Sequence, residues 1–157
     1  MKIQLVVVGK TTQDFVKNGL DEFGKRLKHY LPFEMQVIPE LKNTKNLSFE
    51  QQKEKEGEWL LKMLHPDDYV VLLDEHGKEF SSVDFANYLE KKTHTGTKNL
   101  VFIIGGPYGF SSQVYEKAQE KISLSRMTFS HQLIRIIFVE QLYRAMTILN
   151  HEPYHHE

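Results

Sequence analysis

Apolar runs alternate with amphipathic segments along the whole chain. Five short runs, several of them rich in β-branched residues, are predicted to be strands: residues 2–8, 33–39, 68–73, 98–104 and 122–124. Apolar residues at helical spacing predict helices over residues 12–30, 48–65, 111–120 and 132–149, with a further helix from Ser81 or Ser82 through Leu89. This alternation predicts an α/β fold with a mostly parallel sheet and helices on both faces.

Polar residues mark several of the predicted helix starts. Thr12 or Asp14 is placed to cap the first helix, and Ser48 with Gln51 forms the pattern of a capping box. Ser130 is placed to cap the last helix. These signals leave the polar segment between the second strand and Ser48 as a loop.

The last predicted helix is apolar on nearly all of its faces, with Arg135, Glu140 and Arg144 as interruptions. A helix of this kind is buried on all sides. We expect one side to pack on the sheet and another on a second subunit, because two-fold dimers are the commonest soluble oligomers. Burial at the centre of a single chain is the alternative.

Three loops are the first candidates for a ligand site, because parallel α/β sheets bind ligands at the carboxyl ends of their strands. These loops follow Leu73, Ile104 and Leu124. The second is the sequence GGPYG at 105–109, whose glycines allow either close approach of a ligand to the backbone or simply a tight turn. The third continues into the hydroxyl-rich stretch 123–131, whose backbone groups suit a purine edge; an ordinary loop is the alternative.

Other catalytic motifs are incomplete. The sequence GKTT at 9–12 resembles the end of a phosphate-binding loop, but Gln4 stands where that loop needs a glycine. There is no GxSxG motif of the kind that carries a nucleophilic serine. Asp74 and Glu75 are candidates for a paired-carboxylate site, although a turn or helix cap is the simpler interpretation.

The C-terminal segment NHEPYHHE contains three histidines. His151 and His155 are spaced for a metal, but Pro153 breaks any helix that would align them, so no metal site is predicted. The segment is either a solvated tail or folds back over a site and supplies hydrogen-bond donors. Together with Arg126 and the neighbouring basic residues, it gives this end of the chain a local basic bias.

Composition bounds the class of protein. The 157 residues, of which 40% are hydrophobic, suffice for one domain spanning 1–157. The absence of cysteine favours a reducing compartment, and no apolar stretch resembles a signal peptide or a membrane span, so we expect a cytoplasmic protein with no membrane partner. A net charge of −1 counts against a general nucleic-acid binder.

Five segments carry a resemblance to a known family: KIQLVVVGK, VLLDEHGKEFSS, LVFIIGGPYGFS, SLSRMTFSHQLIRIIFVEQLYRA and NHEPYHHE. In this order they resemble the RlmH family, the SPOUT-class methyltransferases that act on N3 of a pseudouridine in large-subunit ribosomal RNA. The resemblance extends over the whole chain. Gln132 departs from it, because some members have proline there, which affects how the last helix begins.

The resemblance implies a C-terminal trefoil knot, an exception to the usual rules of chain threading. It also implies a homodimer that binds S-adenosylmethionine at the knot beside the partner subunit. The substrate would be a pseudouridine in a hairpin loop of 23S rRNA, presented by the ribosome. Carried over by motif, the cofactor-binding residues would be Leu73, Gly105, Leu124, Ser125, Arg126, Met127, Thr128 and Phe129.

Methyl transfer to a ring nitrogen needs alignment and removal of a proton, and it needs no metal. Arg144 and His131 are candidates for positioning the substrate. Tyr154 and His155 are candidates for closing the site or moving the proton, a role that suits histidine near neutral pH. Lys25, on the predicted first helix with its basic neighbours, is a candidate contact with the ribosome or simply part of a solvated face.

Three alternatives remain open at this stage. One is a methyltransferase of the same class that acts on another RNA, such as transfer RNA, against which the tail motif argues. Another is a non-catalytic nucleotide-binding module, which a parallel sheet alone would permit. The last is a ribosome-associated factor without activity. The glycine loop at 105–109 and the C-terminal tail both argue against it.

Overall fold

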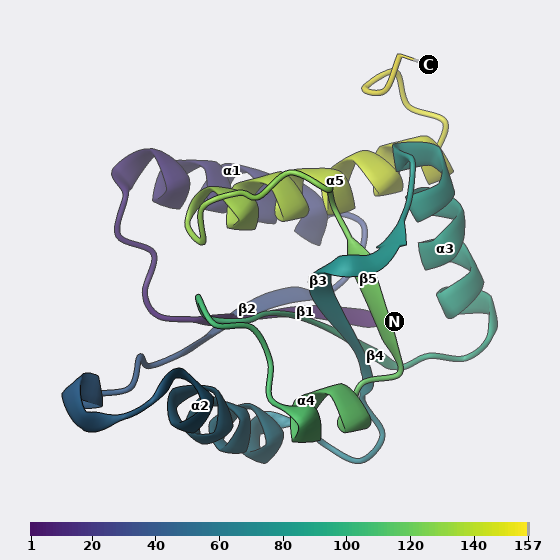
Figure 1. Cartoon of the computed structure of the whole chain (residues 1–157). Coiled ribbons are helices and arrows are strands. Elements are labelled where there is room, and N and C mark those ends of the chain that lie inside the picture. The colour runs from purple at the N-terminus through teal and green to yellow at the C-terminus, as the bar shows by residue number, and fades with distance from the viewer. Residues whose placement is uncertain (157) are drawn as a thin grey trace.

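A five-stranded sheet forms the centre of the protein in the computed structural model, which describes residues 1–156 (Figure 1). The strand order is β2-β1-β4-β3-β5, and every neighbouring pair is parallel. The strands are β1 (Lys2–Val8), β2 (Phe33–Ile38), β3 (Tyr69–Glu79), β4 (Asn99–Ile104) and β5 (Glu120–Ser123). The predicted α/β class and the parallel sheet are therefore confirmed.

Helices cover both faces of the sheet, as predicted (Figure 1). One face carries α1 (Asp14–Lys28), α3 (Ser82–His94) and α5 (Leu133–Leu149). The other face carries α2 (Phe49–Met63) and α4 (Ser112–Lys117), with the short 3-10 helix η1 (Thr44–Asn46) before α2. Among residues 1–156, no helix is both long and apolar enough to cross a membrane.

The strand β1, the first half of β3 and the strand β4 are largely apolar because each contributes side chains to two cores. In β4, Phe102 and Ile104 lie in the core under α1, α3 and α5, whereas Val101 and Ile103 lie in the core under α2 and α4. Alternate residues of a strand point to opposite faces, so a sheet covered on both sides needs apolar side chains at every position. The sequence pattern thus has a direct structural cause.

Local capping signals predicted one helix start correctly and another wrongly. The capping box of α2 is confirmed: the Ser48 hydroxyl accepts from the Gln51 amide at 3.1 Å, and the Gln51 side chain accepts from the Ser48 amide at 2.9 Å. At α1, neither Thr12 nor Asp14 caps the helix. Gln13 stands at the cap without a side-chain hydrogen bond, because this end is held by contacts with α5 instead.

Several elements differ in length from the prediction: α1 is shorter at both ends, α3 extends beyond Leu89 to His94, and α4 and β3 differ for reasons that the structure shows. Helix α4 ends at Lys117 and not at 120, because β3 binds Gln119 through both its backbone and its side chain: the Gln119 amide donates to Val70 O at 2.9 Å, and its side-chain oxygen accepts from Val70 N at 2.6 Å. Strand β3 continues beyond Leu73 to Glu79, where its polar half pairs with β5 after a bulge.

The start of α5 is tied to the loop after β1 by a buried arginine. Arg135 is 1% exposed, and its guanidinium donates to Val8 O at 2.9 Å, Thr11 Oγ1 at 2.9 Å and His131 O at 3.1 Å. Gln132 adds a second tie, because its side chain accepts from Thr12 N at 2.8 Å and donates to the backbone of the same loop. A proline at position 132 has no side-chain amide and could not form these bonds. Gln132, which departs from the family pattern, therefore has a structural role.

We expect Arg135→Met to lower the free energy of unfolding by roughly 2 to 3 kcal/mol, because it leaves buried oxygen atoms such as Val8 O without a donor. Urea unfolding checks this. Arg126→Met is the matched control: its side chain is 85% exposed and its ion pair spans 4.0 Å, so a change below about 0.5 kcal/mol is expected there. Equal effects of the two substitutions would contradict the anchoring role of Arg135.

Candidate functional site

A cavity of about 510 Å³ opens at the carboxyl ends of β4 and β5, beside the polar half of β3 that follows Leu73. Its walls come from the three segments that were predicted, those after Leu73, Ile104 and Leu124, although the first of them is part of β3 and not a loop. The volume is in the range of small-molecule sites, which commonly measure roughly 300 to 1,000 Å³. The carboxyl-end rule therefore located the cavity correctly.

The glycine loop forms one wall, and its residues leave no room for side chains. A Cβ atom on Gly105 would lie 2.9 Å from the Phe110 ring, and one on Gly106 would lie 2.5 Å from the Glu56 carboxylate. Gly109 has a φ of +84°, and its amide donates to Gly106 O at 3.2 Å. The loop is thus both a tight turn and a cavity wall, so the two interpretations of its glycines are compatible.

Serine side chains hold the opposite wall in place. Ser123 Oγ donates to Ser125 O at 2.9 Å, and Ser125 Oγ accepts from Met127 N at the same distance. Ser130 Oγ accepts from Leu133 N at 3.1 Å, although Gln132 occupies the formal cap position of α5. The hydroxyl-rich composition of this stretch therefore stabilises the loop itself.

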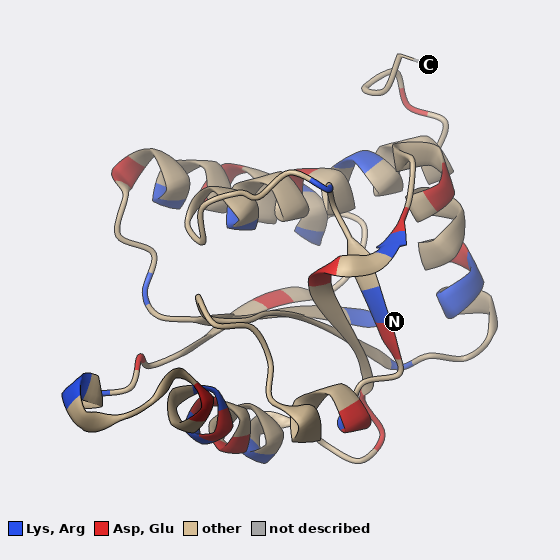
Figure 2. Ribbon diagram, in the orientation of Figure 1, with Lys and Arg blue, Asp and Glu red and all other residues tan. Residues whose placement is uncertain are grey.

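The charge around the cavity is one-sided. In the described part of the chain, no Lys or Arg lines the cavity, whereas Asp74 and Glu75 do. Figure 2 shows the same sparsity of basic residues along the glycine loop and the segment after β5. The Arg126 side chain points outwards, its Nε 4.0 Å from a Glu79 oxygen. Such a lining favours a cationic ligand and disfavours a phosphate.

Seven of the eight residues carried over as cofactor-binding line this one cavity: Leu73, Gly105, Leu124, Ser125, Met127, Thr128 and Phe129. The side chain of the eighth, Arg126, does not. His131, a candidate for positioning the substrate, also lines the cavity. Residues that lie up to 58 positions apart in the sequence (131 − 73 = 58) are thus brought together.

A contact between Tyr115 and Asp74, two residues of the cavity wall, was not predicted from the sequence. Tyr115 on α4 donates a short hydrogen bond to Asp74, and the other oxygen of Asp74 accepts from His76 N at 2.8 Å. Burial, together with the bond to Asp74, raises the pKa of Tyr115 to about 12. Asp74 thus lies within β3 and bonds to Tyr115 and to the backbone of its own strand, whereas the simpler interpretation placed it in a turn or helix cap. Nothing in the local sequence links Tyr115 to it.

The tail folds back, but onto α5 and not over this cavity. His155 Nδ1 lies 3.0 Å from a guanidinium nitrogen of Arg144, and Tyr154 donates to Glu140 Oε1 at 3.0 Å. Arg144 also donates to Glu140 at 2.6 Å. Burial, followed by the bond to Glu140, raises the pKa of Tyr154. We call Glu140, Arg144, Tyr154 and His155 the tail cluster.

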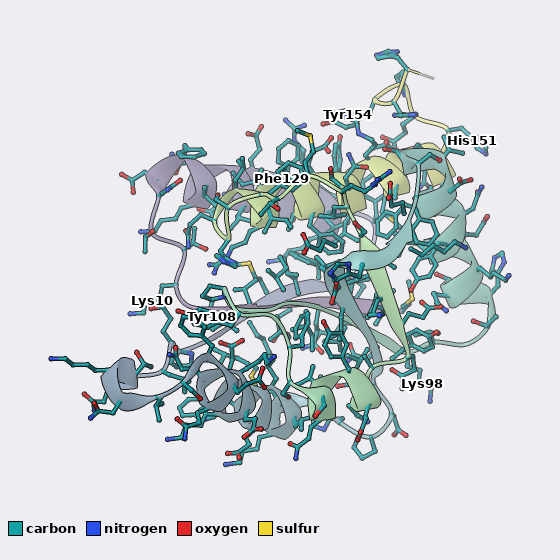
Figure 3. All side chains as sticks on the ribbon, viewed as in Figure 1. Lys10, Lys98, Tyr108, Phe129, His151 and Tyr154 are labelled. Carbon is teal, nitrogen blue, oxygen red and sulfur yellow. The ribbon has the colours of Figure 1, made fainter. Side chains whose placement is uncertain are left out.

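The tail cluster lies further along α5 than the first turn, which lines the cavity. Arg144 is far enough along the helix from Leu133 to place it about 16 Å from the helix start. Figure 3 shows Tyr154 beside α5, well away from Tyr108 at the glycine loop. The candidate residues thus form two groups: His131 lies with the cavity, and Arg144, Tyr154 and His155 lie apart from it. Within residues 1–156, no three His, Asp or Glu side chains are grouped to hold a metal ion.

Comparison with known proteins agrees with this geometry. A family model described as "Predicted SPOUT methyltransferase" matches residues 1–155. The chain is 68% identical to a protein from Phocaeicola vulgatus and 66% identical to one from Parabacteroides distasonis, each over 157 residues that cover all of both chains. A protein from Flavobacterium johnsoniae is 55% identical over the same full length. All three carry the name Ribosomal RNA large subunit methyltransferase H.

The chain belongs to the SPOUT methyltransferases and, within that family, to the RlmH group that these relatives represent. The resemblance seen in five sequence segments is thereby confirmed over the full length.

Glu56 makes the stability of the glycine loop dependent on pH. Its carboxylate accepts from Gly106 N at 3.0 Å, yet burial above all, and the nearby Glu40, raise its pKa above the ordinary 4.5. A raised carboxyl pKa means that ionisation costs more in the folded state than in the unfolded state. Glu56→Gln keeps an acceptor for Gly106 and is expected to raise the free energy of unfolding near pH 7. The gain is expected to disappear as the pH falls below about 4.5.

Urea unfolding at several pH values measures this effect. Glu58→Gln, an exposed substitution on the same helix, serves as the control. A destabilising Glu56→Gln at neutral pH would show that the charge on Glu56 is needed for the bond to Gly106.

Proposed function

We propose that the protein methylates N3 of a pseudouridine in a 23S rRNA hairpin loop, with S-adenosylmethionine as methyl donor. It acts as a cytoplasmic homodimer on the assembled ribosome, and each chain forms a single domain with a trefoil knot in its C-terminal part. Methylation of large-subunit ribosomal RNA follows from membership of the RlmH group. We add four points to that conclusion: the methyl donor, the position of the methyl group, the knot and the dimer.

The acidic lining of the cavity is the observation that supports S-adenosylmethionine as the methyl donor. Asp74 and Glu75 face a cavity from which Lys and Arg are absent among the described residues. This electrostatic environment favours the positive sulfonium and ammonium groups of S-adenosylmethionine. It opposes a flavin or nucleotide phosphate, and so it argues against the non-catalytic nucleotide-binding alternative.

The shape of the cavity also fits a cofactor of this size. The glycine loop presents backbone where Cβ atoms would collide with Phe110 and Glu56. In the opposite wall, serine side chains are occupied in holding the loop, so backbone amides and carbonyls are the groups left to contact an adenine edge. Backbone recognition of this kind explains why no charged motif marks the site in the sequence.

Bound S-adenosylmethionine supplies an electrophilic methyl group, and the chain must orient the ring nitrogen and accept its proton. His131 lines the cavity and is suited to orienting the ring. Arg144, held by Glu140, is suited to stabilising negative charge on the ring carbonyls. Tyr154 and His155 are placed beside Arg144 to close the site or to take up the proton.

A second subunit would bring His131 at the cavity together with the tail cluster, which lies apart from it within one chain. Within one chain the tail cluster lies about 16 Å along α5 from the cavity end. Large apolar side chains near the start of α5 are exposed, including Phe15 at 60%, Met127 at 77% and Leu133 at 38%. A two-fold dimer that covers these residues could bring the tail cluster of one chain to the cavity of the other. This arrangement also accounts for the apolar character of α5 on nearly all faces.

Methyl transfer from labelled S-adenosylmethionine tests the proposed function. Assembled ribosomes, free large subunits and naked 23S rRNA are the acceptors, each with and without the target pseudouridine. We expect label in the 23S rRNA of ribosomes and none when the pseudouridine is absent. No transfer, together with no cofactor binding by calorimetry, would refute the proposal.

Mixed dimers test whether the two groups act across subunits. We expect His131→Ala and His155→Ala each to lose most activity alone, because each removes one half of both sites. Co-expression of the two variants should restore about a quarter of wild-type turnover, because half of the randomly paired dimers carry one intact site of two. Full turnover in either variant alone would rule out the role of that histidine, and no restoration would place both groups in one chain.

A further inference from the structure

Two aromatic rings stack on each other at the protein surface beside the cavity. Phe49, at the start of α2, and Tyr108, in the glycine loop, have ring centroids 4.1 Å apart and planes inclined by 17°. Phe49 is 63% exposed and Tyr108 is 43% exposed. Aromatic side chains of this size usually bury most of their area, so a solvent-facing stack needs an explanation.

Folding does not supply that explanation. The start of α2 is already held by the capping box of Ser48 and Gln51. Within residues 1–156, Phe49 belongs to neither of the two buried apolar clusters, whereas Leu60 of the same helix does. The outward face of the Phe49 ring therefore remains available to a partner.

The stack stands at the junction of two cavities. Tyr108 lines the cofactor cavity, and it also lines a second cavity of about 270 Å³ that shares Gly106 and His131 with the first. Glu40 and Glu56 lie in the wall of this second cavity, together with the buried Arg135. Carboxylates there repel phosphate but accept hydrogen bonds from the N–H groups of a nucleobase edge.

Exposed lysines lie in the segment that precedes Phe49 and in the loop after β1. Lys42 and Lys45 lie exposed in the loop and the 3-10 helix that precede Phe49. Lys10 lies on the loop after β1, where its carbonyl accepts from Gln132, a residue of the second cavity wall, at 3.2 Å. Figure 3 shows Lys10 and Tyr108 at the same edge of the molecule. The exposed loops therefore carry lysine ammonium groups, the stack presents aromatic rings, and the wall of the second cavity contains the carboxylates.

We propose that Phe49 and Tyr108 form a stacking platform for an unpaired base of the RNA substrate that neighbours the methylated nucleotide. The base stacks on the Phe49 ring, while the lysines contact the flanking phosphates. Unpaired RNA bases are commonly bound in this way, by stacking on aromatic side chains inside a basic rim. The inference rests on the proposed RNA substrate and adds where the RNA lies relative to the cavity.

Substitution of Phe49 tests the platform, because this side chain lines neither cavity. Phe49→Ala is expected to raise the KM for ribosomes about ten-fold or more, which is the effect typical of losing one stacked base. Phe49→Trp should restore the KM, whereas Phe49→Leu, which is apolar but has no aromatic face, should not. Trp59→Ala removes another exposed aromatic side chain of α2 and is expected to leave the KM unchanged.

Cofactor affinity, measured by calorimetry, separates stacking from a structural role. If Phe49 only supported the glycine loop, Phe49→Ala would weaken cofactor binding and Phe49→Leu would restore it, and the proposal would fail. A wild-type protein without methyl transfer would overturn the proposed function itself. Normal transfer with equal KM values for Phe49→Ala and Trp59→Ala would overturn the platform alone.

Crosslinking identifies the partner directly. A photoreactive benzoyl derivative of phenylalanine at position 49 should attach to 23S rRNA when the full-length protein is irradiated on ribosomes. Attachment to a ribosomal protein, or to a second copy of the chain, would show that the stacked rings form a protein interface and would refute the platform.

Discussion

The buried guanidinium of Arg135 is the contact on which the site depends. A charge in a protein interior is costly unless it is fully hydrogen-bonded, and here three oxygen atoms, from Val8, Thr11 and His131, supply the bonds. Burial lowers the pKa of Arg135, and the nearby Glu40 opposes that effect. These bonds join the end of β1 to the start of α5. They therefore fix one end of the segment that walls the cavity, while β5 fixes the other.

Once both ends of that segment are fixed, the rest of the site follows from topology. Parallel strands end at one edge of the sheet, so the loops after β4 and β5 meet there, beside the polar half of β3 that follows Leu73. The glycine loop and the segment after Ser123 face each other across the cavity. Helix α5 then leads away from this edge and places Arg144 about 16 Å along its axis from Leu133. A single chain therefore has a cavity and a separate tail cluster, which the proposed dimer would unite.

The sequence predicted the regular parts of this structure well. Continuous apolar runs located the strands, and the capping box located the start of α2, because both signals act over a few residues. The residue-level cofactor set came from family resemblance, and the fold places most of it around one cavity. The sequence did not reveal the contact of Tyr115 with Asp74, the role of Arg135 or the stack of Phe49 on Tyr108. Each depends on residues 41 or more positions apart (115 − 74 = 41), which no local pattern connects.

The net charge of −1 constrains how such a protein recognises RNA. Binding dominated by phosphate neutralisation needs an extended basic surface and depends steeply on salt. Here the cavity lining is acidic, and no Lys or Arg is among its described residues, so phosphate contacts inside it cannot supply the specificity. For the proposed substrate, the remaining sources of recognition are the shape of the assembled ribosome, stacking on exposed rings and hydrogen bonds to the base itself. On this proposal the low net charge adds selectivity, because free RNA would gain little affinity from phosphate contacts alone.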